Sequence, residues 1–379
     1  MDNFILFPFW AKKGCGYFDD KYNIVINPEF NDFSHFSEGL AVISDPKTGL
    51  KGYINEKGKT VIFPRFEEAA PFKEGMARVS LKERSGWKSG FIDKTGNMVI
   101  PMLYWRAENF SEEHGVVMTD PEGKYGFINK KGKFVIPEQY DAASDFSESM
   151  SAVKIENKWG FIDKNGRLRI PAIYDYASSF SEDFAAVNIG GNLCFMPPKG
   201  GNWTYIDKTG KTVTEPFPFN SLGDFHEGYA AFSLPYEFVE IASENSFILR
   251  KNRRLTAISQ YKKICKKILG VFKTEIRNRN DYYGYLNKKG EIVIKPEYYR
   301  ADDFSEGLAA VSVFSDWETN RIGFVNKAGE LVIPAKYEAV SGFKNGLSWV
   351  ARELDNRCLY IDKTGKTVWP PYYNFYDSI

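Results

Sequence analysis

Cysteine and histidine are scarce in this chain of 379 residues, which has four Cys and three His. Four Cys do not make a disulfide framework in a chain of this length, and no Cys-x-x-Cys or His-x-x-His spacing predicts a zinc site. Long apolar runs are also missing, so no membrane span is expected. Residues 1–16 lack the basic leader and the long apolar stretch of a signal peptide. These absences predict a soluble, reduced, cytoplasmic protein without a metal site or a cofactor.

The chain also lacks an excess of either charge, with 50 Lys plus Arg against 49 Asp plus Glu. The chain as a whole is therefore not expected to bind polyanions through its net charge. Aromatic residues, in contrast, make up 16% of the sequence, and 32 residues are Gly. This combination favours strands joined by tight turns over a helical bundle.

One phrase recurs along the chain: Gly, an aromatic residue, an aliphatic residue, Asp or Asn, Lys, any residue and Gly, then an aliphatic stretch that usually ends in Pro. It is clear in WGFIDKNGRLRIP from Trp159 and in YGFINKKGKFVIP from Tyr125. Nine copies are recognisable, and in eight of them the turn glycine stands at position 58, 96, 132, 166, 210, 290, 329 or 365. A second phrase, Phe-Ser-Glu followed by small apolar residues, recurs between the copies. This self-similarity is typical of a repeat protein.

Each unit is expected to form a three-stranded antiparallel meander followed by a linking segment. Asp163 to Gly166 should form a hairpin turn, in which the Asp side chain accepts backbone N–H groups and Gly adopts a left-handed conformation. Pro171 is expected to end the second strand, because Pro has no N–H to donate to a ladder. The third strand follows the Phe-Ser-Glu turn, over Ala185 to Ile189. Stacked neighbours would then bury the aromatic and aliphatic faces together.

The pattern resembles the WG-repeat family, whose Trp-Gly pair stands here as Trp159-Gly160. The resemblance covers nearly the whole chain outside 235–281, although Trp203 and Cys358 are not followed by Gly. It implies bacterial β-hairpin repeats with a binding or scaffolding role, and it carries no catalytic residues. From the repeat length we predict an all-β protein of stacked three-stranded meanders in an open or superhelical array. A closed β-propeller-like ring is the alternative, although propeller blades usually need four strands.

Length variation falls on one connection, between the third strand of one unit and the first strand of the next. The chain accordingly divides into repeats one to six (1–234), an insertion (235–281) and repeats seven to nine (282–379). Repeat proteins often bind partners on the face that carries insertions, so we predict a non-enzymatic scaffold that binds a protein partner there. No small-molecule substrate is expected. Because exposed aromatic side chains dominate interfaces, the predicted partner-binding residues are Trp87, Phe195, Met196 and Trp317.

The insertion is strongly basic, since residues 250–279 hold eleven Lys and Arg and one acidic residue, Glu275. Apolar residues at every third or fourth position from Leu255 to Ile276 predict an amphipathic α-helix. Such a helix could pack on the acidic repeats, bind an anionic partner such as nucleic acid, or lie on a membrane, the least favoured of the three. The residues predicted to bind an anionic partner are Arg250, Lys251, Arg253, Arg254, Lys262, Lys263, Lys266 and Lys267.

Overall fold

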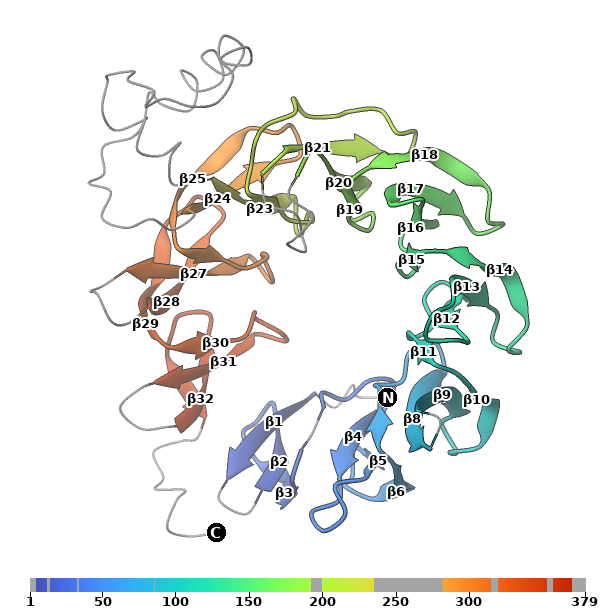
Figure 1. Cartoon of the computed structure of the whole chain (residues 1–379). Coiled ribbons are helices and arrows are strands. Elements are labelled where there is room, and N and C mark those ends of the chain that lie inside the picture. The colour runs from blue at the N-terminus through green and yellow to red at the C-terminus, as the bar shows by residue number, and fades with distance from the viewer. Residues whose placement is uncertain are drawn as a thin grey trace.

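The computed structural model of the chain describes residues 5–11, 14–32, 34–84, 86–191, 200–234, 282–314, 320–352 and 357–369. These residues form nine antiparallel sheets that follow one another around a ring (Figure 1). No helix occurs among them. The amphipathic helix predicted for the insertion lies outside the described residues.

The strands are numbered in chain order, and each sheet is built from consecutive strands. The first four sheets consist of β1 (Leu6–Ala11), β2 (Gly14–Asp19) and β3 (Ile24–Phe30); β4 (Leu40–Ser44), β5 (Lys51–Asn55) and β6 (Thr60–Phe66); β7 (Glu68–Ala69), β8 (Met76–Glu83), β9 (Gly86–Asp93) and β10 (Met98–Tyr104); and β11 (Arg106–Ala107), β12 (Gly115–Met118), β13 (Tyr125–Ile128) and β14 (Phe134–Tyr140). The other five consist of β15 (Ala142–Ala143), β16 (Met150–Ile155), β17 (Lys158–Asp163) and β18 (Leu168–Tyr174); β19 (Tyr176–Ala177), β20 (Phe184–Ile189) and β21 (Asn202–Asp207); β22 (Ser221–Leu222), β23 (Tyr229–Leu234), β24 (Tyr282–Asn287) and β25 (Ile292–Tyr298); β26 (Arg300–Ala301), β27 (Leu308–Phe314), β28 (Asn320–Asn326) and β29 (Leu331–Tyr337); and β30 (Ala339–Val340), β31 (Leu347–Arg352), β32 (Arg357–Asp362) and β33 (Thr367–Trp369).

A fourth, short strand corrects the predicted three-stranded meander in most units. The segment before each Phe-Ser-Glu turn, which the sequence suggested to be a link, forms this strand. In the fifth sheet Ala142 pairs with Lys154 and Ala143 with Val153. The short strands β15 and β19 lie on the inner side of the ring, whereas β14 and β18 lie on its outer side (Figure 1). The six units that have this fourth strand therefore have the strand number of a propeller blade.

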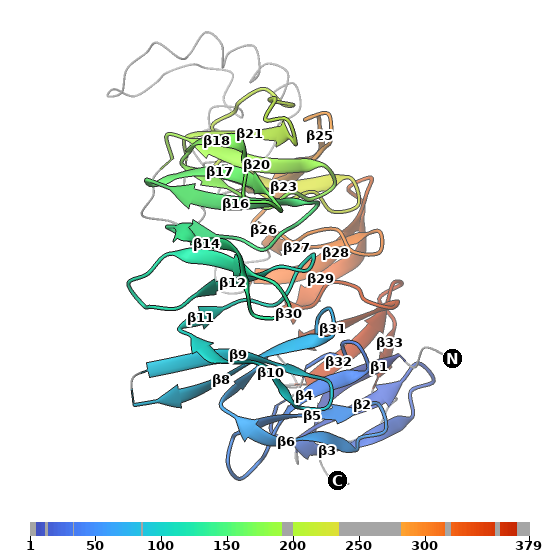
Figure 2. The same cartoon turned by 90° about the vertical axis from the view of Figure 1, so that its right-hand side faces the viewer.

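The ring is closed, so the predicted open or superhelical array is wrong and the propeller alternative is correct. Phe7, Phe9 and Phe18 of the first sheet pack in one cluster with Leu347, Tyr360 and Trp369 of the last. The Tyr360 hydroxyl also donates a hydrogen bond to the carbonyl of Pro8 at 2.7 Å. Figure 2 shows the first and last sheets side by side from a second direction. Within the described residues, the first and last sheets share no strand, and side chains join them.

The predicted hairpin turn is confirmed. The Asp163 carboxylate accepts the N–H groups of Asn165 and Arg167 at 2.9 and 3.0 Å, and Gly166 has a φ of 75°. Burial alone would raise the pKa of Asp163, but these N–H groups and Arg169 outweigh it and lower that pKa. The expectation for Pro171 is wrong, because β18 continues through it to Tyr174. This strand is the outer edge of its sheet, where a missing N–H is tolerated.

The Phe-Ser-Glu turns join neighbouring sheets. The Ser181 hydroxyl donates to the carbonyl of Phe225 in the next turn at 2.6 Å, and Glu182 accepts the N–H of Gly228 at 2.9 Å. Lys288 also lies 3.0 Å from the Glu182 carboxylate. Burial by itself would raise the pKa of Glu182, yet the ammonium and N–H groups lower it. The same Ser-to-carbonyl bond recurs at Ser37, Ser111, Ser147 and Ser305. The serine hydroxyl and the glutamate carboxylate of these turns therefore have a structural role, because they join one sheet to the next.

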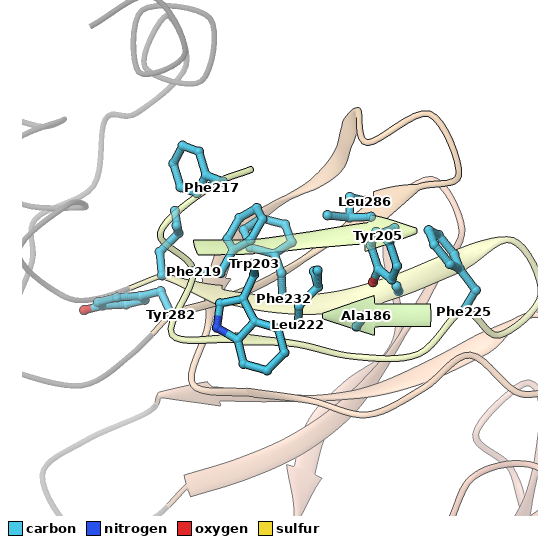
Figure 3. Close-up of a cluster of buried hydrophobic side chains, with 12 residues drawn as sticks. Ala186, Trp203, Tyr205, Phe217, Phe219, Leu222, Phe225, Phe232, Tyr282 and Leu286 are labelled. Atoms are coloured by element: carbon cyan, nitrogen blue, oxygen red, sulfur yellow. The ribbon is translucent and has the colours of Figure 1, made fainter. Parts of the chain in front are cut away.

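The sixth sheet lacks a regular outer strand, and an aromatic cluster fills its place. Thr204 stands where most repeats have Gly, and its hydroxyl donates to the Thr214 carbonyl at 2.6 Å. Only isolated bridges follow, at Trp203↔Phe217 and Ile206↔Thr212. Phe217 and Phe219 pack with Trp203 and with Phe232 of the next sheet (Figure 3). Side-chain packing thus connects the sixth and seventh sheets.

The two ends of the insertion are neighbours in one sheet. Leu234, the last residue of β23, pairs with Tyr282, the first residue of β24. The sheet that contains them takes β22 and β23 from before the insertion and β24 and β25 from after it. The ring therefore needs only a hairpin turn at this point.

Deletion of residues 235–281, with Asn-Gly joining Leu234 to Tyr282, should leave the ring folded. A two-residue Asn-Gly turn suits strands in this register, and shortening a loop does not raise its closure cost. Thermal unfolding followed by circular dichroism should remain cooperative, with a midpoint near that of the full chain. A deletion variant that fails to fold would show that the insertion belongs to the core of the protein.

Candidate functional site

Trp87 lies near the tip of an extended hairpin in the third sheet. It pairs with Lys82, and the β8–β9 ladder continues past it to Glu83↔Gly86. In the fifth sheet the corresponding ladder ends at Ile155↔Lys158. The Trp87 hairpin projects from the end of the sheet where connections vary in length, opposite the Asp-Lys-x-Gly turns.

A hollow of about 360 Å³ opens beside this hairpin, between the third and fourth sheets. We call it the Trp87 pocket. It is lined by Glu68, Arg78, Ser80, Trp87, Ser89, Trp105, Arg106, Ala107 and Glu108. Its volume is within the range of small-ligand and side-chain binding sites.

Period-two alternation places the floor and one wall of the Trp87 pocket on a single face of the third sheet. Trp87 and Ser89 are two residues apart on β9, and Arg78 and Ser80 are two residues apart on β8, so each pair lies on one face of the sheet. Ser80 is directly opposite Ser89. The Ser80 and Ser89 hydroxyl oxygens lie 2.9 Å apart, and an N–H of Arg78 donates to Ser80 at 3.1 Å. Arg78 also lies 3.3 Å from Glu68. The floor of the pocket is therefore polar, although its walls are aromatic.

The opposite wall begins with Trp105, which packs against Gly86 of the hairpin. A Cβ atom at Gly86 would lie 2.3 Å from the Trp105 ring, so only glycine permits this approach. Arg106 follows, 3.6 Å from Glu108 and 3.3 Å from the Tyr125 hydroxyl. Each arginine at the rim therefore has a carboxylate beside it, and the rim is close to neutral.

Of the predicted partner-binding residues, Trp87 alone lies in the described part of the chain. Phe195, Met196 and Trp317 lie outside it, as do the eight basic residues predicted to bind an anionic partner, Arg250, Lys251, Arg253, Arg254, Lys262, Lys263, Lys266 and Lys267. Those predictions remain predictions. Sequence reasoning missed Ser89, Trp105 and the two arginines of the pocket. Ser89 was the signal that could have located the pocket, because this small residue occupies the position that the aromatic residues Tyr125 and Trp159 hold in the next two repeats.

A second hollow, of about 560 Å³, lies where the first and last sheets meet. We call it the closure pocket. Phe7 and Trp10 of the first sheet and Trp349 and Tyr360 of the last contribute to its lining. His35 also lines it, and burial, together with the nearby Lys344 ammonium, lowers the pKa of this imidazole. Sequence reasoning did not find this pocket, because it exists only in the closed ring.

An aspartate stands directly before the phenylalanine of the Phe-Ser-Glu turn, or of its equivalent, in several sheets. Burial raises the pKa values of Asp224 and Asp303, which the nearby His226 partly offsets. His226 Nε2 lies 3.3 Å from an Asp303 oxygen. In the described residues, no group of three or more His, Cys, Asp or Glu side chains is arranged to hold a metal ion.

Asp145, at the equivalent position of the fifth sheet, is expected to destabilise the fold at neutral pH. Burial raises its pKa to about 6, against the opposing effect of Lys73 and with a contribution from Glu108. One carboxyl oxygen is buried without a hydrogen-bond partner. The folded state therefore keeps a proton that the unfolded state releases, so stability falls as pH rises from about 4 to about 6.

Replacing Asp145 with asparagine should thus raise the free energy of unfolding at pH 7.5 by about 1–2 kcal/mol, since partial exposure reduces the full penalty. Urea unfolding at pH 7.5 and at pH 4 measures the effect, and the two proteins should differ little at pH 4. Equal stabilities at pH 7.5 would show that water solvates the carboxylate.

The inner short strands, the outer edge strands and the closed circle of nine sheets define a β-propeller built from sequence repeats. The WG containing repeat model matches the chain eight times, at residues 16–44, 52–84, 90–121, 125–159, 159–192, 203–234, 283–313 and 322–352. The chain therefore belongs to the WG-repeat family, which confirms the resemblance seen in the sequence. No curated protein matches the chain significantly.

Several solved structures are similar to the chain at low sequence identity. One is dihydro-heme d1 dehydrogenase NirN in complex with DHE, with a TM-score of 0.46 and 10% identity over 86% of this chain and 71% of that chain. Another is apo AztD from Citrobacter koseri, with a TM-score of 0.41 and 11% sequence identity, covering 96% of this chain and 93% of that chain. A third is the β-propeller domain of the Trilobed protease from Pyrococcus furiosus, with a TM-score of 0.40 and 9% sequence identity, covering 99% of this chain and 98% of that chain. Similarity at this level carries no conclusion about function.

Among the described residues, none forms an apolar helix long enough to span a membrane.

Proposed function

We propose that this propeller is a non-enzymatic, cytoplasmic scaffold that binds a protein partner at the Trp87 pocket. The observation that carries the proposal is the pocket itself, in which two tryptophans and two arginines surround a hollow at the end of a sheet. Tryptophan and arginine are the residues most enriched at the energetic centres of protein interfaces. The hairpins at this end of the sheets vary in length from repeat to repeat, and connections of variable length often carry binding residues.

The test compares an altered pocket with an altered surface elsewhere. Purified tagged protein is used to capture partners from a lysate of the native host, and captured proteins are identified by mass spectrometry. Trp87→Ala combined with Trp105→Ala should abolish capture of a partner that the wild type retains. Phe63→Ala is the matched control, because this side chain is 76% exposed on β6, outside the pocket. A partner lost with Phe63→Ala but kept by the double variant would contradict the proposal.

A second candidate function is nucleic-acid binding by residues 250–279. It is supported by their eleven basic residues against one acidic residue. Binding should weaken steeply as salt rises, because each phosphate contact releases counterions. Changing Lys262, Lys263, Lys266 and Lys267 to Glu should abolish an electrophoretic shift of DNA or RNA. If the wild type gives no shift at low salt, this candidate is wrong.

A further inference from the structure

The Trp87 pocket is a repeat position that the chain leaves unfilled. The residue before the recurring Gly is Tyr125, Trp159 and Tyr283 in the fourth, fifth and seventh sheets, and Ser89 in the third. In the fifth sheet, Trp159 packs on a cluster that includes Ala177 of the next sheet. Ala177 is the last residue of the short strand β19, and Ala107 is the last residue of the equivalent short strand β11, in the sheet that follows Ser89. Ala107 lines the pocket. An aromatic ring from another molecule can therefore take the place that Trp159 fills in the fifth sheet.

Hydrogen bonding at the floor of the pocket indicates which aromatic ring fits. An N–H of Arg78 donates to the Ser80 oxygen, and Ser80 and Ser89 share one hydrogen bond. That bond uses one of the two hydroxyl hydrogens, and no oxygen or nitrogen atom among the described residues accepts the other. The pocket consequently presents an O–H donor at a buried position, since Ser80 and Ser89 are 2% and 3% exposed.

A phenol suits this donor better than an indole or a phenyl ring. The phenolic oxygen of tyrosine accepts hydrogen bonds, whereas the tryptophan indole only donates and phenylalanine does neither. The fourth sheet offers a precedent, because the Tyr125 hydroxyl accepts an N–H of Arg106 at 3.3 Å. The positive charge of Arg78 is balanced by Glu68 and that of Arg106 by Glu108, so the rim favours a neutral ring over an anionic one.

On the basis of the proposed function, we propose that the Trp87 pocket binds a tyrosine side chain of the protein partner. The phenol ring lies between Trp87 and Trp105, and its oxygen accepts the free hydroxyl hydrogen of the Ser80–Ser89 pair. Offset or edge-to-face contacts with the two indoles supply the apolar part of the binding energy.

Two fluorinated probes test the proposal on the full chain by ¹⁹F NMR titration: N-acetyl-3-fluorotyrosinamide and N-acetyl-4-fluorophenylalaninamide. The tyrosine probe should bind the wild type about fivefold more tightly, the difference expected for one hydrogen bond. Ser89→Trp should abolish binding of both probes, because it fills the pocket with the residue that the fifth and sixth repeats carry there. Ser80→Ala combined with Ser89→Ala removes both hydroxyl donors, so it should preserve binding of the phenylalanine probe and reduce the fivefold preference, whether or not Ser89→Trp folds.

Equal affinity of the wild type for the two probes would overturn the proposal, as would unchanged tyrosine binding in Ser89→Trp. Partner capture separates this proposal from the proposed function. If Ser89→Trp still captures a partner that Trp87→Ala with Trp105→Ala loses, the scaffold function stands and the tyrosine proposal fails. If the probes behave as expected but the wild type captures no partner, tyrosine binding stands and the proposed function fails.

Discussion

Replacing Trp369 with alanine is expected to lower the free energy of unfolding by about 3–5 kcal/mol, as for other buried Trp-to-Ala changes. Trp369 is 4% exposed, and its ring stacks on Phe18 of the first sheet with centroids 4.3 Å apart. Phe9 meets the same indole at 5.5 Å. Because side chains join the first and last sheets within the described residues, the substitution removes a large part of what closes the ring.

Urea unfolding followed by circular dichroism measures the loss, with Phe63→Ala as the control. Phe63 is 76% exposed, so its replacement should change stability by no more than about 0.5 kcal/mol. Hydrogen exchange should locate the effect, with faster exchange in β1 and β32 than in strands on the far side of the ring, such as β17. Uniform acceleration around the ring would show that the junction is not a local weak point.

The junction also explains why Pro8 is compatible with β1. In the second sheet the Tyr53 hydroxyl donates to the carbonyl of Ala70 in the next sheet, and Tyr205 and Tyr285 make equivalent bonds. Tyr360 in the last sheet makes the corresponding bond to Pro8 of the first sheet. A proline still offers its carbonyl, and its missing N–H costs nothing on the edge of a sheet. The repeated tyrosine bond therefore continues across the junction.

Much of a single repeat could be predicted from the sequence, because local chemistry determines it. The Asp163 turn and its left-handed glycine follow from residue type and spacing alone. The short strand β15 could not be predicted in this way. Its residues, Ala142 and Ala143, show no strand-like alternation, and their strand conformation depends on pairing with β16. Closure could not be predicted either, because it depends on how each sheet is rotated relative to the next.

The candidate site was predicted only in part, for a related reason. Trp87 was recognisable as an unusual aromatic residue in a variable connection. Trp105 and Ser89 acquire their significance from contacts between two sheets, and those contacts require the register of the whole repeat. Ser89 is informative because it is smaller than the residues at the same position of other repeats, a signal that a search for reactive or exposed residues overlooks.

Gly160 provides the second large effect, since its replacement with alanine should cost about 3 kcal/mol, at the upper end of overpacking penalties. Between the pairs Trp159↔Tyr174 and Phe161↔Ile170 the outer strand bulges toward Gly160. A Cβ atom at Gly160 would lie 2.6 Å from the Ile170 carbonyl oxygen and 2.7 Å from the Ala172 nitrogen. Both are backbone atoms, so relief requires the strand itself to move.

Thr204 indicates what that movement does, because in the sixth sheet a side chain occupies the same position and the regular outer strand is replaced by two isolated bridges. Gly342→Ala is the matched control: the nearest atom to a Cβ there is 3.6 Å away, and its φ is not left-handed. Urea unfolding should therefore separate the two alanine variants by at least about 2 kcal/mol. If Gly160→Ala is as stable as Gly342→Ala, the bulged strand can shift without loss, and the glycine of the Trp-Gly pair is not required by packing. If the difference is as large as expected, the close approach of the outer strand explains why this position takes glycine in the fifth repeat.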